Sequence, residues 1–283
     1  MKGPSSTLPL ASPLGQRVLT AFLLGPLVLV AVLWLPDPGF AAALGLVVLW
    51  AAWEWGQLGG LMRREHRVGY LALLGLLLLV LWAVSGLRPW LIGAGALWWI
   101  LQTVQLARLR EVPLRSGIQA GDLGAGLLVL AAPWAALVEL HRVDPQGPAL
   151  VLFLMVLVWT ADSLAYFVGR RFGRITLAPR ISPGKTREGV YGALVGAVLW
   201  GLLYGWVRSL GLSGTLLAAL LCVLTVLVSV VGDLYESLLK RGRGLKDSSH
   251  LLPGHGGLLD RVDSLTAAAP VFVLGLALTG GLQ

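Results

Sequence analysis

The fold is decided where the apolar run SGTLLAALLCVLTVLVSVVG, residues 213–232, gives way to DLYESLLKRGRGLKDSSHLLPGHGGLLDRVD, residues 233–263. The first run is long enough to cross the hydrocarbon core of a bilayer as a helix, which takes about 20 apolar residues. The second stretch is polar and charged, and another apolar segment follows it to residue 280. The sequence therefore predicts two membrane-spanning helices joined by a charged insert.

The composition of the whole chain is that of an integral membrane protein. Hydrophobic residues make up 57% of the 283 positions and charged residues only 13%, and the mean hydropathy is +0.80. Soluble domains carry about twice this share of charged residues. The net charge of +8 suits membrane lipid head groups and phosphorylated substrates. We expect no nucleic-acid partner, because no basic tail or RNA-binding motif is present.

The same length criterion predicts nine spanning segments in the chain. They cover residues 17–35, 39–57, 68–86, 89–107, 120–140, 148–169, 190–208, 213–232 and 262–280. We therefore expect an all-α polytopic integral membrane protein, with a polar cavity on its cytoplasmic side where the charged loops between the spans meet. A flexible tail (residues 1–16) would precede transmembrane scaffold helices (17–147) and a catalytic transmembrane domain (148–283).

The charges of the loops predict the orientation, because Lys and Arg are enriched on the cytoplasmic side of a membrane. With the amino terminus inside, only Arg88, Arg142 and Arg208 of the 22 Lys and Arg residues remain outside. Both large polar loops, 170–189 and 233–261, then face the cytoplasm, where nucleoside triphosphates are found, and the carboxyl terminus lies outside. We expect a multi-pass protein of the cytoplasmic membrane.

Acidic side chains stand at both ends of the charged insert. Residues three or four apart share a helix face, so Asp233 can pair with Glu236 and Asp260 with Asp263. Carboxylates completed by water and substrate phosphates are the usual ligands of Mg²⁺, and the Lys and Arg residues between them suit phosphates. The glycine turn at residues 254–257 permits positive φ angles and close approach of a ligand.

Three stretches of the insert resemble the signature of the phosphatidate cytidylyltransferase family, also called CDP-diacylglycerol synthases. They are SxLKR at residues 237–241, KD at 246–247 and PxHGGLxDRVD at 253–263. Many fixed positions at fixed spacings leave little room for chance agreement. The resemblance implies a membrane enzyme of phospholipid biosynthesis that joins CTP and phosphatidic acid, with Mg²⁺, to give CDP-diacylglycerol and pyrophosphate. It also implies a symmetric homodimer.

The polar loop SPGKTREG, residues 182–189, is similar to the Ser-Pro-Lys-Lys-Thr-x-Glu-Gly element of the same family. Gly184 stands where a lysine is usual, which removes one phosphate contact and leaves Lys185 as the main candidate. We expect a turn opened by Pro183 and a helix entered near Thr186, whose free amides and hydroxyl suit phosphate oxygens. A generic positive loop on the inner side is the structural alternative.

The segment DSLAYFVGR, residues 162–170, is similar to a further element of the family. Asp162 lies eight residues before Arg170, or about 12 Å along a helix, which places it in the inner half of the membrane. A carboxylate at that depth needs a polar cavity or a cation. Asp162 is therefore assigned to the polar site, and a hydrogen bond between packed helices is the alternative.

The resemblance and the chemistry together assign roles to individual residues. The attacking phosphate oxygen of phosphatidate is ionised at neutral pH, so catalysis should rest on positioning and charge neutralisation rather than on a general base. The expected ligands of two divalent cations are Asp233, Asp260 and Asp263. The expected catalytic residues are Asp233, Lys246, Asp260, Arg261 and Asp263. The expected substrate-binding residues are Asp162, Ser182, Lys185, Thr186, Lys240, Arg241, Asp247, His255, Gly256 and Gly257.

Three other acidic residues, Glu54, Asp122 and Glu139, lie close to ends of predicted spans. Long charged side chains there can reach the membrane interface at little cost. We expect structural roles for all three.

Other functions also suit a membrane protein with charged residues near its helices. A transporter of phosphorylated solutes would be expected to contain inverted repeats, and none is visible in this sequence. A CDP-alcohol phosphotransferase would open its motif with Asp-Gly-x-x-Ala-Arg, which is missing. A CTP-dependent polyprenol kinase shares the nucleotide and the membrane placement, and only the long signature separates it from the favoured function.

Overall fold

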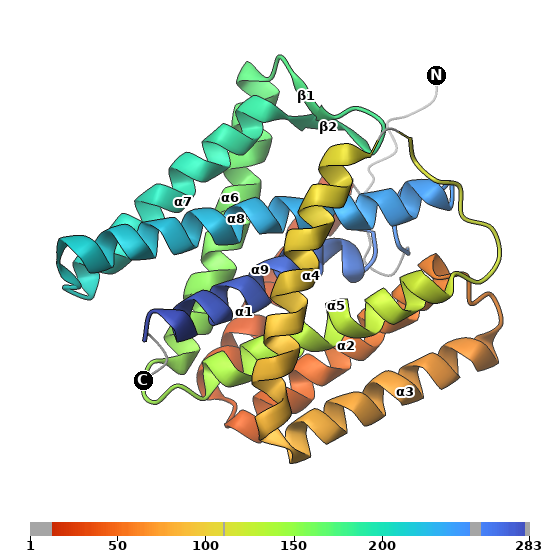
Figure 1. The fold of residues 1–283 in the computed structure, drawn as a ribbon, viewed down its shortest axis with the longest axis horizontal. Helices are drawn as coiled ribbons and strands as arrows, with labels where there is room; N and C mark the ends of the chain where they lie inside the picture. The colour runs from red at the N-terminus through yellow and green to blue at the C-terminus, as the bar shows by residue number, and fades with distance from the viewer. Residues whose placement is uncertain (1–12, 110, 250–255, 281–283) are drawn as a thin grey trace, which may run out of the picture.

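The computed structural model describes residues 13–109, 111–249 and 256–280, and within them the chain forms nine α-helices and almost no sheet (Figure 1). The helices are α1 (Pro13–Trp34), α2 (Asp37–Leu58), α3 (Arg64–Ala83), α4 (Arg88–Arg108), α5 (Ala120–His141), α6 (Gly147–Phe172), α7 (Arg187–Val207), α8 (Gly211–Gly242) and α9 (Leu259–Leu278). Helices α2 to α9 are long and apolar enough to cross a membrane, and so confirm the predicted all-α polytopic membrane fold. Each helix overlaps one predicted span. Residues 1–12 of the predicted tail lie outside the described part, and α1 already begins at Pro13.

Helix α8 is longer than predicted. The predicted span ends at residue 232, but the helix continues to Gly242 and includes the first part of the charged insert. Leu, Glu, Lys and Arg are good helix formers, and Glu236 pairs with Lys240 one turn later, which supports the helix. Gly244, with φ +70°, ends it, because a left-handed residue after the last turn lets its carbonyls be capped.

A two-stranded hairpin connects α6 to α7, and Figure 1 shows it at the ends of these helices. Strand β1 (Thr176–Ala178) pairs antiparallel with β2 (Ser182–Thr186). The predicted helix entry is confirmed: α7 begins after Thr186, whose hydroxyl accepts a hydrogen bond from the Gly189 amide at 3.2 Å. The strands themselves were not predicted, because the SPGKT stretch lacks the alternation of apolar residues typical of a strand.

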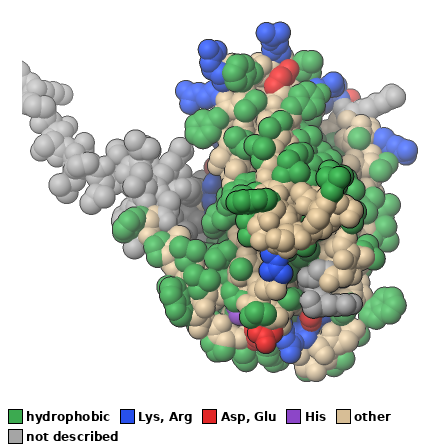
Figure 2. Space-filling model, turned by 90° about the vertical axis from the view of Figure 1, so that its left-hand side faces the viewer, with side chains coloured by type: hydrophobic (Ala, Val, Ile, Leu, Met, Phe, Trp, Pro, Cys, Tyr) green, Lys and Arg blue, Asp and Glu red, His purple; other side chains and the backbone are tan. Residues whose placement is uncertain are grey.

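The core lies around α5, which packs against α2, α4 and α9. Its small side chains Ala131, Ala135 and Ala136 are completely buried. The long helix α8 packs on α7 and α9 and crosses the other helices in Figure 1. Figure 2 shows one outer face largely covered by hydrophobic side chains, with Lys and Arg gathered at its upper edge, at the height of the hairpin in Figure 1.

The loops that follow α2, α4, α6 and α8 meet at one end of the molecule. Arg243 donates hydrogen bonds to the carbonyl oxygens of Leu58 and Gly117, both at 2.8 Å. Arg241 donates to the carbonyl oxygen of Ile181, next to the hairpin, at 3.3 Å. These are the loops predicted to share one side of the membrane. The division between scaffold and catalytic domain at residue 148 stays a prediction; α9 packs closely on α4 and α5 across it.

Candidate active site

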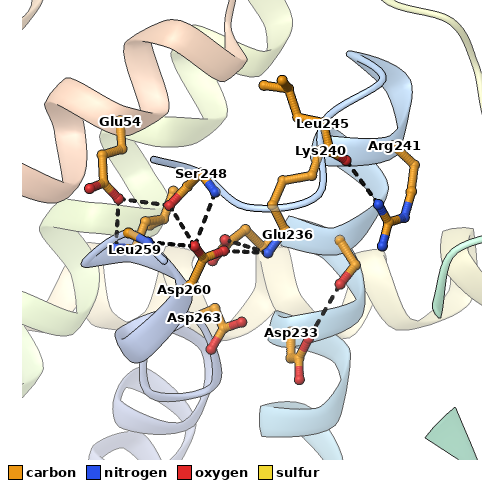
Figure 3. Close-up of polar contacts among 12 residues, drawn as sticks. Glu54, Asp233, Glu236, Lys240, Arg241, Leu245, Ser248, Leu259, Asp260 and Asp263 are labelled. Atoms are coloured by element: carbon orange, nitrogen blue, oxygen red, sulfur yellow. Dashed lines mark hydrogen bonds and ion pairs between the residues drawn. The ribbon is translucent and has the colours of Figure 1, made fainter. Parts of the chain in front are cut away.

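The two acidic pairs of the insert face each other because α8 and α9 approach closely. A Cβ atom at Gly232 would lie 2.7 Å from the Asp263 carbonyl oxygen and 2.8 Å from the Ala267 Cβ. Only glycine allows this distance between the helices. It places Asp233 on α8 within electrostatic reach of Asp263 on α9, as Figure 3 shows.

Lys240 is the buried cation of the site. Its Nζ lies 2.9 Å from Glu236 Oε1, on the same face of α8, and 2.5 Å from Asp260 Oδ1, in the first turn of α9. Glu236 is only 2% exposed, and its Oε2 has no hydrogen-bond partner among the described residues. Figure 3 shows Lys240 between the two carboxylates. Burial of so many charges is tolerable because opposite charges lie in contact.

The second oxygen of Asp260 is held by the loop before α9. Asp260 Oδ2 accepts hydrogen bonds from the Ser248 amide at 3.0 Å and the Gly257 amide at 2.8 Å. The Ser248 hydroxyl lies 3.0 Å from the same oxygen and shares its one proton between Asp260 and Glu54. Both oxygens of this carboxylate therefore have partners.

Glu54 holds the same loop from the other side. Its Oε1 accepts hydrogen bonds from the Ser249 hydroxyl at 2.6 Å and the Leu258 amide at 3.0 Å. Its Oε2 accepts from the Ser248 hydroxyl and the Leu259 amide, each at 2.8 Å. The expectation that Glu54 reaches the interface is wrong: the side chain is 1% exposed, because four donors meet it inside the protein.

The other two acidic residues near span ends form ion pairs. Asp122 pairs with Arg115 at 2.6 Å, and Glu139 pairs with the buried Arg88 at 2.5 Å. Their structural roles agree with the expectation.

A second group of side chains comes from α6, β2, α8 and α9. Lys185 on β2 forms an ion pair with Asp233 Oδ2. The Asp162 carboxylate on α6 interacts with both of them and with Ser264 on α9. The structure thus brings Asp162, Lys185, Asp233 and Asp263 together.

The remaining predicted residues lie around this centre or serve other contacts. Lys246, Asp247 and Arg261 are exposed. Arg241 donates to the carbonyl oxygens of Ile181 and Leu245, and Ser182 lies in β2 with Thr186. Gly256 has the expected positive φ, +79°, and His255 lies outside the described residues. The substrate contacts assigned to all of these stay predictions.

The site holds more carboxylates than lysines. Asp162, Asp233, Glu236, Asp260 and Asp263 share the space with Lys185 and Lys240. Among the described residues, no three acidic, His or Cys side chains form a ready-made metal cage. The donors nevertheless fit Mg²⁺ in kind: all are carboxylate oxygens, which this cation prefers, and it usually keeps several waters and binds through one or two carboxylates plus substrate phosphates.

Comparison with known proteins decides the family of the chain. The model of the cytidylyltransferase family matches residues 15–279. The chain belongs to the cytidylyltransferase family. A phosphatidate cytidylyltransferase of Pseudomonas aeruginosa is 45% identical over 259 residues, which are 92% of this chain and 95% of the relative. One of Haemophilus influenzae is 37% identical over 282 residues, 92% and 97% of the two chains. One of Bacillus subtilis is 38% identical over 158 residues, 54% and 58% of the two chains.

This cytidylyltransferase is therefore a nucleotidyltransferase with membrane-spanning helices, as the resemblance implied. Sequence reasoning missed the part that Glu54 and Ser248 play at the site, and the part that Arg243 plays in joining the loops. The available signal for Glu54 was a carboxylate between two tryptophans in an apolar helix, since a charge in such a place requires partners. No local sequence pattern singles out Ser248 or predicts that it contacts the distant Glu54.

Proposed function

We propose that the chain is a phosphatidate cytidylyltransferase, which transfers CMP from CTP to phosphatidic acid and releases pyrophosphate. One observation carries the proposal: Asp162, Lys185 and Asp263, which lie in three segments similar to the family's, converge with Asp233 on one polar centre between helices. The names of the relatives support the same reaction, and the two matched over nearly their whole length are 45% and 37% identical.

In this reaction a phosphate oxygen of phosphatidate attacks the α-phosphorus of CTP. The new P–O bond joins lipid phosphate to CMP, and the bond from the α-phosphorus to the bridging oxygen breaks, so that its electron pair leaves with pyrophosphate. The attacking oxygen is already ionised, and no proton has to be removed from it. The protein must therefore position two anions and neutralise their charge.

The residues of the site suit this task. Lys185 comes from the hairpin beside Asp233 and is partly accessible, so it can exchange its carboxylate partner for a phosphate oxygen. Lys240 is buried and fixed by Glu236 and Asp260, and it supplies a constant positive charge at the floor of the site.

Mg²⁺ is part of the proposal, and Asp233 and Asp263, with Glu236 beside them, would hold it. Bound there, the cation would supply positive charge against the triphosphate and the departing pyrophosphate. Asp260, the third ligand predicted from the sequence, already accepts three hydrogen bonds and the Lys240 ion pair. We therefore propose that the main role of Asp260 is to hold Lys240 in position. The number of cations proposed from the sequence is two.

We further propose that the site faces the cytoplasm and opens sideways to the inner leaflet. The four loops predicted for the cytoplasmic side contact one another at the end of the molecule that carries the site. Phosphatidic acid has its phosphate at the interface and its acyl chains in the lipid, so it can reach the site laterally. On the resemblance alone, we propose a homodimer in the cytoplasmic membrane.

The test is transfer of labelled CTP into a product extractable by organic solvent. The purified protein is assayed in mixed micelles with phosphatidic acid, with and without Mg²⁺. Metal-dependent formation of labelled CDP-diacylglycerol is the expected result. If CTP binds but phosphatidic acid accepts no label, a polyprenol acceptor replaces the lipid in the proposal. If CTP does not bind at all, the enzyme assignment fails and a transporter becomes the better hypothesis.

A further inference from the structure

A buried carboxylate from the amino-terminal half of the chain holds the loop that carries the signature. Glu54 lies in α2, and its four hydrogen-bond donors among the described residues belong to Ser248, Ser249, Leu258 and Leu259, about 200 positions away. Two of the donors are backbone amides at the start of α9. A carboxylate there also interacts favourably with the positive end of the helix dipole. The contact therefore fixes where α9 begins.

The contact continues into the site through Ser248. This side chain is 1% exposed, and its hydroxyl lies 2.8 Å from Glu54 Oε2 and 3.0 Å from Asp260 Oδ2. Asp260 in turn holds Lys240. Figure 3 shows the line of contacts from Glu54 through Ser248 and Asp260 to Lys240. Each member has its position fixed by the next.

The network has no spare room. A Cβ atom at Gly257 would lie 2.0 Å from the Ser248 hydroxyl and 2.4 Å from Glu54 Oε2. A carboxylate with several good hydrogen bonds cannot move aside without losing them. Gly257 and Ser248 are thus packed directly against the Glu54 side chain.

We propose that Glu54 is a positioning residue for cytidylyl transfer. It holds Ser248, Ser249, Leu258 and Leu259 so that Asp260 sets the position of Lys240 beside the acidic centre. The inference rests on the proposed function, because it concerns the rate of that reaction. Glu54 itself touches neither Lys240 nor the acidic centre through any of its four hydrogen bonds, so its effect passes through Ser248 and Asp260.

Glutamine cannot replace Glu54 in this place. Each carboxylate oxygen accepts one backbone N–H, from Leu258 at Oε1 and from Leu259 at Oε2. In either orientation of an amide, its NH₂ group would face one of these amides, and two donors cannot bond to each other. The Glu54→Gln variant therefore keeps the size of the side chain and loses its function.

The experiment compares Glu54→Gln with Glu139→Gln in the CMP-transfer assay. Glu139 lies near the carboxyl end of α5, whose last residue, His141, contacts Asp37 at the start of α2. Glu54 lies near the other end of α2, so Glu139 is at the opposite end of the bundle from the site. The Glu139→Gln substitution also removes a carboxylate, in this case the partner of the buried Arg88. Both variants are assayed well below their unfolding midpoints, with rates normalised to folded protein. We expect kcat of Glu54→Gln to fall about tenfold to a hundredfold and KM for CTP to change less than about threefold. Glu139→Gln should keep the wild-type kcat.

Three outcomes decide the matter. If wild-type protein transfers no CMP, the proposed function fails. If wild type is active and Glu54→Gln keeps its kcat, or if Glu139→Gln loses as much, the positioning role is overturned. Should Glu54→Gln not fold, Ser248→Ala serves instead, because it removes the bridge to Asp260 but leaves both backbone amides bonded to Glu54. It must then lower kcat by about tenfold at an unchanged KM for CTP, and a wild-type kcat would overturn the proposal.

Discussion

The two acidic groups of the site differ in how many of their carboxylate oxygens have a hydrogen-bond donor or a cation as partner. Around Glu54 and Asp260 every carboxylate oxygen has at least one donor or cation. Around Asp233 and Asp263, carboxylates outnumber cations, and Lys185 is the cation paired with Asp233. The first group, which we call the saturated network, is complete as it stands. The second, the acidic centre (Asp162, Asp233, Glu236 and Asp263), contains more carboxyl groups than cations to pair with them.

The difference indicates a division of labour. A network whose hydrogen bonds are all made within the protein resists displacement, because every shift leaves a buried group unpaired. A group of carboxylates in excess gains most from an added cation or cationic ligand. The saturated network therefore suits positioning, and the acidic centre suits metal and phosphate binding. Each prediction below compares one group with the other.

The largest effect is expected from Asp263→Asn in the acidic centre. This substitution preserves the shape of the side chain but removes the charge that would hold the cation. We expect turnover to fall by at least about a hundredfold, and the Mg²⁺ concentration needed for half-maximal activity to rise. Labelled CMP transfer across a Mg²⁺ titration measures both quantities. Wild-type activity with a wild-type Mg²⁺ response would remove Asp263 from the cation site.

The saturated network should respond differently, through geometry and stability. In Gly257→Ala the added methyl group would meet Ser248 and Glu54. Overpacking of this kind costs about 1–3 kcal/mol of stability, and we expect kcat to fall about tenfold with an unchanged Mg²⁺ response. Thermal unfolding and the CMP-transfer assay provide the measurements.

Gly93→Ala is the matched control for that substitution. Nothing lies within 4 Å of a Cβ at Gly93 in α4, so alanine there should leave kcat unchanged and stabilise the helix by about 0.5–1 kcal/mol. A Gly257→Ala protein as stable and active as Gly93→Ala would show that the network is not tightly packed.

The acidic centre was easier to predict from the sequence than the saturated network. Asp233 and Asp263 stand out because they are charges at the ends of apolar runs, and short-range helix periodicity already pairs such residues. The nine helices follow from segment length for the same reason, since hydropathy is a local property. The end of α8 was misplaced, because the insert is polar yet made of helix-forming residues.

The hydrogen bonds of Glu54 could not be predicted from local sequence patterns. Its position near the end of α2 suggested contact with the membrane interface, whereas its partners lie in a loop about 200 residues away. Hydrogen bonds over such a separation depend on how α2 and α9 pack together, and no periodicity or spacing in a single sequence contains that information. The packing partners of Gly232 and Gly257 were hidden for the same reason.

A smaller effect is expected at the edge of the acidic centre, from Lys185→Ala. Removing the ammonium group leaves Asp233 without its ion-pair partner and takes away one proposed phosphate contact. We expect KM for CTP to rise about tenfold, the value of one good charged contact, with a smaller change in kcat. Arg180→Ala, at an exposed position in the same hairpin, is the control and should leave KM for CTP unchanged. Equal effects of the two substitutions would mean that the hairpin contributes only its general positive charge.

The smallest effect is expected from Ser237→Ala, although Ser237 opens the family signature. Its hydroxyl contacts Asp233 Oδ1 at 3.4 Å, a long and weak hydrogen bond. The Ser248 hydroxyl, by contrast, contacts two carboxylates at 2.8 Å and 3.0 Å. We therefore expect Ser237→Ala to change kcat by less than about threefold, against about tenfold for Ser248→Ala. Side-by-side kcat values of the two serine variants test this directly. If Ser237→Ala is the more damaging, the Ser237 hydroxyl must bind substrate rather than orient Asp233.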